Sequence, residues 1–140
     1  GVCRAFGIDC PRIALIHCTE KTSPKFPLTL DYGQLKEMAA EGRFGHIIID
    51  GPMDVKVACD PHAGALKGII SPVDGRADAL IMPDIESGNV FYKTLTGFVG
   101  ALTAGMLVGT SAPVVLPSRG DSTRAKLCSL AMACLTATDR

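Results

Sequence analysis

The segment best suited to chemistry in this chain is Ser118-Arg119-Gly120-Asp121, which separates two apolar stretches. The stretch before it, 113–117, is rich in valine and bounded by prolines, and it predicts a buried strand. The stretch after it, 123–136, has apolar residues at helical spacing. Parallel α/β sheets bind ligands at such strand-to-helix junctions, where free backbone N–H groups attract anions. Because a guanidinium also binds phosphate through paired hydrogen bonds, the segment predicts a phosphate site.

Two further strand ends carry polar residues, Asp50 and Asp84. Lys93 lies four residues after Asn89, so both are expected on one face of the helix that follows Asp84. The carboxyl ends of parallel strands emerge at one edge of a sheet. These groups and Arg119 are therefore expected to line one polar cleft.

Each of these residues also has a purely structural explanation. Asp84 can end its strand, Ser87 can cap the following helix, and Lys93 can be a solvated surface charge. Asp121 suits the N-cap of the last helix, and capping is its expected role. Arg119 is the strongest functional candidate, because its small, polar neighbours provide little packing for its stem.

The composition excludes several classes of partner. Basic and acidic residues balance at 14 each, and aromatic residues make up 5% of the 140 residues. A neutral chain with few aromatic residues is not expected to bind nucleic acid. No run reaches the ~20 apolar residues that span a bilayer, so no membrane partner is expected. The first six residues lack a signal-peptide core and resemble a chain entered partway through a helix.

The six cysteines and three histidines do not form a metal-site pattern. No Cys-x-x-Cys pair occurs and the histidines are scattered, so no metal is expected. Cys18, Cys128 and Cys134 lie in apolar surroundings and are expected to be core residues of a protein in the reducing cytoplasm. The alternative, a catalytic thiol at Cys18 beside His17, conflicts with strand geometry, because adjacent residues of a strand point to opposite faces.

Strands and helices are predicted to alternate along the chain. Strands are expected at 12–18, 46–50, 79–82, 106–108 and 113–117, and helices at 31–41, 54–66, from 86 or 87 through 102, and from about 121 to 137. Thr29 or Asp31 is the expected cap of the first helix, and Gly51-Pro52 is expected to end the second strand. This alternation predicts an α/β fold with a mostly parallel sheet and right-handed crossovers. The glycine-rich loops of dinucleotide and nucleoside-triphosphate sites do not occur.

In order and spacing, these motifs resemble those of the phosphate acetyl/butyryl transferase family. The resemblance rests on Asp50-Gly51-Pro52, on 67–75, on 77–80 leading into 83–93, and on 118–122 with the helix after it. It covers nearly the whole chain. The aspartate in Ser-Arg-x-Asp-Ser makes the butyryltransferase branch the closer match.

The resemblance implies reversible transfer of an acyl group between acyl-CoA and inorganic phosphate, which gives an acyl phosphate and CoA. Coenzyme A and phosphate would be substrates, and no metal or bound cofactor is implied. Ser118 and Arg119 would bind the phosphoryl group, and Arg119 would stabilise its charge during transfer. The substrate-binding residues implied with them are Asp84, Asn89, Lys93 and Gly120.

At the position where the family has a proton acceptor for the thiol of CoA, this chain departs from the family pattern. Arg124-Ala125 stands where acetyltransferases have an aspartate and butyryltransferases often have a glutamate nearby. Asp121 or another carboxylate would then serve as the base, or the reaction would need none, or the activity would be altered.

The resemblance also implies a three-layer, mostly parallel fold like that of isocitrate/isopropylmalate dehydrogenases, in a cytoplasmic homodimer. Family members are roughly twice this length, which fits two domains of about 150 residues. The chain is therefore expected to be the carboxyl-terminal half. Residues 1–117 would form the second α/β domain, and residues 118–140 the active-site turn and a helix that packs on an absent first domain. Alone, this piece is expected to be inactive.

Two other functions are also compatible with the sequence. One is a noncatalytic CoA-binding and dimerisation module of a larger protein. The other is a dehydrogenase of the same architecture that acts on a phosphorylated hydroxy acid. The dehydrogenase would require metal-binding aspartates near the cleft, which the pattern does not clearly supply.

Overall fold

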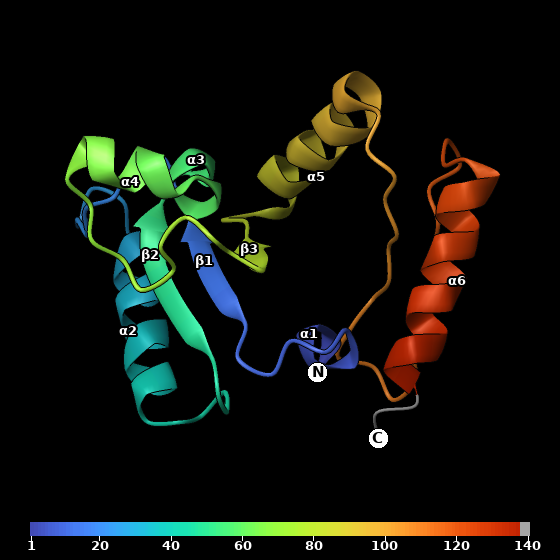
Figure 1. Cartoon of the computed structure of the whole chain (residues 1–140), viewed down its shortest axis with the longest axis horizontal. Coiled ribbons are helices and arrows are strands. Elements are labelled where there is room, and N and C mark those ends of the chain that lie inside the picture. Colours follow the sequence, from blue (N-terminus) through green and yellow to red (C-terminus); the bar gives the residue numbers. More distant parts are fainter. Residues whose placement is uncertain (138–140) are drawn as a thin grey trace. The chain divides into compact units, whose positions relative to one another are not determined.

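The computed structural model describes residues 1–137 and divides into two compact units. Residues 8–88 form one unit, here called the sheet unit. Residues 1–7, together with the chain from Asn89 onward, form the other, here called the helical unit. Figure 1 labels their elements along the chain.

The sheet unit contains three parallel strands in the order β2-β1-β3. The strands are β1 (Arg12–Ile16), β2 (Ile48–Met53) and β3 (Ala79–Ile81). Ile13 of the central strand is paired with Ile49 on one side and Ala79 on the other. The α/β class and the parallel pairing predicted from the sequence are confirmed.

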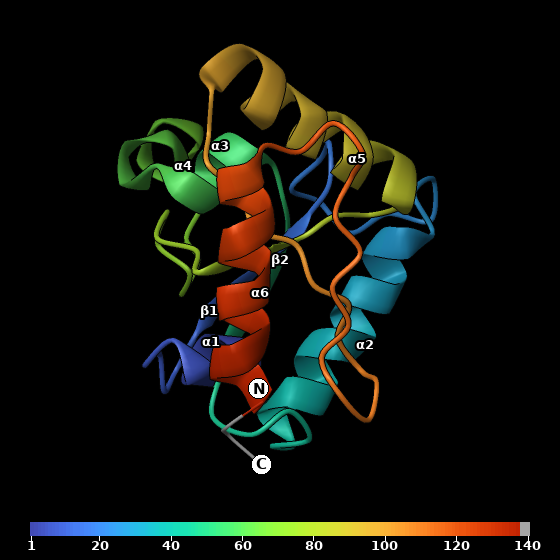
Figure 2. The same ribbon diagram turned by 90° about the vertical axis from the view of Figure 1, so that its right-hand side faces the viewer.

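Three helices accompany this sheet: α2 (Leu28–Ala40), α3 (Val55–Cys59) and α4 (Pro61–Lys67). Figure 2 shows α2 on one side of β1 and β2, and α3 and α4 on the other. The core consists of apolar side chains from the strands, from α3 and α4, and from the loop before β3. Its buried members are Ala14, Ile16, Met53, Val57, Ala58, Ala63 and Val73.

The second strand does not end at Gly51-Pro52, so that prediction is wrong. β2 continues to Met53, whose carbonyl accepts the N–H of His17 at 2.9 Å. The pairing with β1 shifts between Ala14 and Ile16, which accommodates the irregular backbone. Gly51 has a φ of 151°, and a Cβ there would lie 2.5 Å from the carbonyl oxygen of Leu15. The glycine thus allows close approach of two strands rather than a turn.

Helix α2 begins three residues earlier than predicted, and neither Thr29 nor Asp31 caps it. Thr29 is completely buried inside the helix. Its hydroxyl accepts the N–H of Ser23 at 2.9 Å and donates to the carbonyl of Phe26 at 2.7 Å. The burial and the local hydrogen bonds of Thr29 therefore place it inside the helix, although its residue type favours a capping position.

The helix predicted at 54–66 is two helices. Asp54 caps α3 by accepting the N–H of Val57 at 2.7 Å. Asp60 interrupts the run with extended backbone, and its carboxylate accepts the N–H of His62 at 2.9 Å. Pro61 occupies the first position of α4, where its missing N–H costs nothing.

The helical unit contains α1 (Val2–Ala5) and α6 (Thr123–Ala137), and the division between units falls within α5 (Ile85–Thr94). A π-helical turn, Leu95–Val99, extends α5. The predicted continuation to residue 102 is wrong, because Gly100 takes the left-handed conformation, with a φ of 68°, and ends the turn.

The strands predicted at 106–108 and 113–117 do not form. Leu107 and Val114 make one isolated antiparallel bridge, in which the N–H of Leu107 donates to the carbonyl of Val114 at 2.8 Å. The connection between them is too short for parallel pairing, which needs a crossover of about a dozen residues. The Ser118 segment therefore does not follow a parallel strand.

The cysteines are more accessible than predicted. Cys18 and Cys134 are exposed and Cys128 is half-buried, so the core role expected for them is wrong. Across residues 1–137, no helix is long and apolar enough to cross a membrane. The predicted boundary between 117 and 118 concerns the complete protein and stays a prediction, and residues 138–140 of the segment after it lie outside the described residues.

Candidate phosphate-binding turn

Ser118 and Asp121 close a tight turn between the Leu107–Val114 bridge and α6. The N–H of Asp121 donates to the carbonyl of Ser118 at 3.0 Å. The N–H of Ser118 donates to Oδ2 of Asp121 at 2.8 Å. Arg119 and Gly120, at the tip of this turn, are exposed. The turn thus carries an exposed arginine and an exposed glycine directly after Ser118 in the chain.

The N-terminus of α6 is capped by Ser122, and the capping role expected for Asp121 is wrong. Oγ of Ser122 accepts the N–H of Ala125 at 3.1 Å. This frees the Asp121 carboxylate to act inside the turn. Both residues are good caps by type, and only the backbone geometry decides between them.

Helix α5 brings two consecutive side chains to this turn. Nζ of Lys93 lies 3.4 Å from Oγ of Ser118, and the hydroxyl of Tyr92 donates to Oδ1 of Asp121 at 2.7 Å. Nζ of Lys93 also lies 4.8 Å from the centre of the Tyr92 ring. The turn and α5 therefore contribute a hydroxyl in contact with an ammonium group, a second cationic side chain at Arg119, and a hydrogen-bonded carboxylate.

The hydrogen bond between Tyr92 and Asp121 shifts the pKa of both groups. It is the largest cause of the lowered pKa of Asp121, which the positive charges of Lys93 and Lys126 also favour. The same bond is the largest cause of the raised pKa of Tyr92, because a phenolate would face the carboxylate. Asp121 is therefore ionised and Tyr92 protonated at neutral pH.

A hollow of about 520 Å³ adjoins the turn within the helical unit. Lys93, Gly120 and Asp121 line it, together with Arg124 and Thr103. Arg119 does not line this hollow, and among residues 1–137 its guanidinium has no hydrogen-bond partner. It is available to a ligand from outside.

The structure thus brings together four of the predicted site residues: Lys93, Ser118, Gly120 and Asp121. Arg119 belongs to the same turn. Asn89 lies exposed on α5, and within residues 1–137 its side chain has no polar partner. The roles assigned to all of these residues stay predictions.

Asp84 belongs to the sheet unit, where it caps α5. Its Oδ1 accepts the N–H of Ser87 at 2.7 Å, and this bond is the largest cause of its lowered pKa. Ser87 is not the cap, since its hydroxyl donates to the carbonyl of Asp84. In this structure the Asp84 carboxylate therefore caps α5, which is a purely structural role.

Tyr92 is the residue of this site that the sequence analysis missed. It stands directly before Lys93 in the motif, but a phenol there is equally suited to packing. Its partner Asp121 is 29 residues away, and no spacing rule links the two. The only available indication was a polar aromatic residue next to a predicted ligand.

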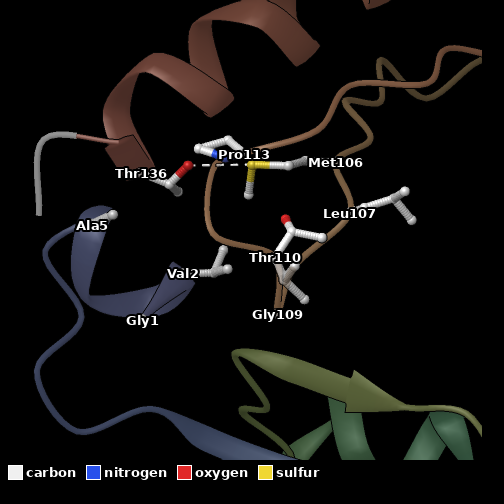
Figure 3. A pocket seen from close by; sticks show the side chains of 10 residues that line it. Gly1, Val2, Ala5, Met106, Leu107, Gly109, Thr110, Pro113 and Thr136 are labelled. Atoms are coloured by element: carbon white, nitrogen blue, oxygen red, sulfur yellow. Dashed lines mark hydrogen bonds between the residues drawn. The ribbon is translucent and has the colours of Figure 1, made fainter. Parts of the chain in front are cut away.

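A second hollow of the helical unit, of about 190 Å³, is mainly apolar (Figure 3). Val2, Ala5 and Pro113 line it, and the hydroxyl of Thr136 lies 3.2 Å from the sulfur of Met106 at its edge. None of the predicted site residues lines it.

Charged and nucleophilic groups also lie at the carboxyl ends of β1 and β2. Nζ of Lys67 lies 2.5 Å from both Oε1 of Glu20 and Oδ2 of Asp54. The bond from Lys67 is the largest cause of the lowered pKa of Asp54. Asp50, which was expected at a strand end, lies inside β2 and pairs with Lys36 at 3.0 Å. These carboxylates have cationic partners of their own.

The thiol of Cys18 lies 3.6 Å from Nδ1 of His17. The argument from opposite strand faces does not apply, because β1 ends at Ile16. The His17 ring is held edge-on against Phe26 and Tyr32, with ring centres 5.1 and 6.4 Å away. Over residues 1–137, no group of three or more His, Cys, Asp or Glu side chains is arranged to hold a metal ion.

Comparison with known proteins identifies the family. A family model described as phosphate acetyl/butaryl transferase matches residues 1–134. The phosphate butyryltransferase of Clostridium acetobutylicum is 45% identical over 136 residues, which are 97% of this chain and 45% of that protein. The phosphate acetyltransferase of Rhizobium meliloti is 40% identical over 97% of this chain and 43% of its own length.

A solved structure agrees with these matches. A branched-chain phosphotransacylase from Enterococcus faecalis has a TM-score of 0.81 and 37% identity, over 97% of this chain and 49% of that one. The chain thus spans about half the length of the relatives it matches. The resemblance found in the motifs is confirmed, since the family model covers residues 1–134. The chain belongs to the phosphate acetyl/butaryl transferase family.

Proposed function

We propose that the complete protein containing these residues transfers acyl groups reversibly between acyl-CoA and inorganic phosphate. The observation that carries this proposal is the contact between Lys93 Nζ and Ser118 Oγ, 3.4 Å apart, at the turn that also carries the exposed Arg119. Two cations and a hydroxyl around a turn are a set of donors suited to a phosphate dianion. Membership of the family supports acyl transfer as the reaction.

In the forward reaction, an oxygen of phosphate attacks the thioester carbonyl carbon. A C–O bond forms, the C–S bond breaks, and the thiolate of CoA leaves with the electron pair. Ser118 and Lys93 would hold the attacking phosphate, and Arg119 would stabilise the charge on it. Fixing both reactants in one place supplies much of the acceleration, and charge stabilisation supplies more.

The reverse reaction requires removal of the thiol proton of CoA. Asp121 is a carboxylate at this turn that could accept it, but its lowered pKa makes it a weak base. Asp121 is therefore proposed as a residue of the site, either as the base or as a residue that holds the turn in its conformation. Gly120 and Asn89 are proposed to contact substrate, as is Asp84.

The proposal extends to the complete protein. It would have a three-layer fold like isocitrate/isopropylmalate dehydrogenases, with residues 1–117 in the second domain and 118–140 packing on the first. It would act as a homodimer in the cytoplasm, with coenzyme A and phosphate as substrates and no bound cofactor. Six free cysteines support a reducing compartment, and the doubled length of the relatives supports a further domain.

The test measures release of free thiol from acetyl-CoA and butyryl-CoA by the complete protein, with and without inorganic phosphate. Thiol release that depends on phosphate, with acyl phosphate formed in equal amount, is the expected result. Release that is independent of phosphate would indicate a hydrolase and contradict the proposal. The 140-residue chain is assayed in parallel and is expected to be inactive.

A further inference from the structure

Tyr92 connects α5 to the phosphate-binding turn through one hydroxyl group. The hydroxyl donates to Oδ1 of Asp121 at 2.7 Å. The other oxygen of Asp121, Oδ2, accepts the N–H of Ser118 at 2.8 Å. Each oxygen of the carboxylate therefore has its own donor, one from the helix and one from the turn, and its rotation is opposed on both sides.

The bond to Ser118 shapes the turn itself. The N–H of Asp121 returns a second bond to the carbonyl of Ser118 at 3.0 Å, so the two ends of the turn are tied in both directions. Arg119 and Gly120 are held between these two ends. If the Asp121 carboxylate loses its donor from Tyr92, it can rotate toward water, and the N–H of Ser118 loses its fixed acceptor.

The charge of Asp121 also bears on an anion at this turn. A free carboxylate beside a phosphate site would repel the ligand. The groups that stabilise the charged form of Asp121 are the hydroxyl of Tyr92, the N–H of Ser118, and the ammonium groups of Lys93 and Lys126. The hydrogen bond from Tyr92 draws on the negative charge of the carboxylate, and the two ammonium groups offset it.

We infer that Tyr92 is a positioning residue for phosphate, which acts through Asp121 to keep the Ser118–Gly120 segment in its anion-binding conformation. The inference rests on the phosphate site proposed above and extends it to a side chain that need not touch the ligand. It assigns Asp121 a conformational role that holds whether or not this carboxylate accepts a proton.

The test measures binding of inorganic phosphate to the complete protein by calorimetry, without acyl-CoA. The variants are Tyr92→Phe, Asp121→Ala and the double variant, and the matched control is Tyr32→Phe. Tyr32 is the other tyrosine of this chain, and it also donates one hydrogen bond, to the carbonyl of Ile16 at 2.9 Å in the sheet unit. Tyr92→Phe should weaken phosphate binding about tenfold, and Tyr32→Phe should leave it unchanged.

The double variant tests the route of the effect. If Tyr92 acts through Asp121, removing its hydroxyl has no further effect in the Asp121→Ala background. Unchanged phosphate affinity in Tyr92→Phe overturns the inference, and so does an undiminished loss in the Asp121→Ala background. Both results come from phosphate binding and not from the acyl-transfer assay. A protein that binds phosphate but transfers no acyl group would therefore contradict only the proposed function.

A pH series separates positioning from simple packing. Tyr92→Phe removes the hydrogen bond that is the largest cause of the lowered pKa of Asp121, so this pKa returns toward its ordinary value. The loss of phosphate affinity on acidification should then begin at higher pH in Tyr92→Phe than in the wild type. Tyr32→Phe should follow the wild-type profile. If phosphate affinity falls at the same acidic pH in Tyr92→Phe as in the wild type, the inference is also overturned.

Discussion

Nζ of Lys93 lies 3.4 Å from the hydroxyl oxygen of Ser118, although the two residues are 25 positions apart. One comes from α5 and the other from the turn before α6. The contact places an ammonium group beside a hydroxyl, and within residues 1–137 neither group is paired with a carboxylate oxygen. Both groups therefore keep donors for a ligand, which separates this pair from Lys67 and its two acidic partners.

The first prediction concerns this ammonium group. In the complete protein, Lys93→Met should raise the KM for phosphate about tenfold and leave the KM for acyl-CoA nearly unchanged, because only the anion loses a charged donor. Steady-state kinetics with each substrate varied in turn measure both constants. The matched control is Lys25→Met, which removes an exposed lysine of the sheet unit. A phosphate KM equal to wild type in Lys93→Met would contradict the proposed role.

The second prediction concerns Arg119, whose guanidinium is exposed and unpartnered in residues 1–137. Arg119→Ala should lower kcat/KM for phosphate by about a hundredfold or more, because charge stabilisation during transfer is lost with the binding. Arg119→Lys should recover only part of it, since an ammonium cannot make two parallel hydrogen bonds. Arg43→Ala, at an exposed arginine of the sheet unit, is the control. An alanine variant with the full rate would remove Arg119 from the site.

The parts of this structure that the sequence predicts are those that local patterns determine. The runs around Ile13, Ile48 and Leu80 are short and apolar, and each becomes a strand of the parallel sheet. The last helix is found within two residues of its predicted start, because its apolar spacing extends over several turns. In contrast, Val114 also lies in a strand-like run but makes one bridge, since pairing depends on a distant partner.

The contact between Lys93 and Ser118 has a different cause from the one that the sequence suggests, and the roles of the site residues stay predictions. Lys93 and Ser118 were expected to meet because parallel strands end at one edge, yet they meet because α5 lies against the turn. The link between Tyr92 and Asp121 depends on tertiary geometry that no local pattern encodes. Asp84 shows the same limit of local patterns, because a carboxylate at a strand end is equally suited to capping: it caps α5 here, and its role toward substrate stays a prediction.

The third prediction concerns the stability of the sheet unit in acid. The folded-state pKa of Asp54 is lowered, first by the bond from Lys67 and then by the N–H of Val57. A lowered pKa adds stability that is fully present above the unfolded pKa, about 4, and is lost as the pH falls through the folded value. Lys67→Met should therefore unfold at lower urea concentration than wild type at pH 7, and this difference should shrink below about pH 4.

The matched variant for this test is Asp54→Asn. Its amide oxygen can still accept the N–H of Val57, so the cap of α3 is kept while the ion pair is lost. It should resemble Lys67→Met in its pH dependence. Urea midpoints followed by circular dichroism between pH 2 and about 8 measure the effect. If the urea midpoints of wild type and Lys67→Met differ by the same amount over this pH range, the ionisation of Asp54 is not coupled to the stability that Lys67 provides.

The fourth prediction concerns Gly51 of β2, which lies close to the backbone of Leu15 in β1. A Cβ at Gly51 would lie 2.5 Å from the carbonyl oxygen of Leu15, and its φ of 151° disfavours any side chain. Gly51→Ala should therefore lower the free energy of unfolding by about 2 kcal/mol or more. Gly33→Ala is the matched control, because it makes the same substitution inside α2 with no atom within 4 Å of the new Cβ. It should be neutral or stabilise the fold by up to about 1 kcal/mol. Urea unfolding of both variants measures the contrast, and equal midpoints would show that the close approach of Gly51 to Leu15 is not a constraint on this fold.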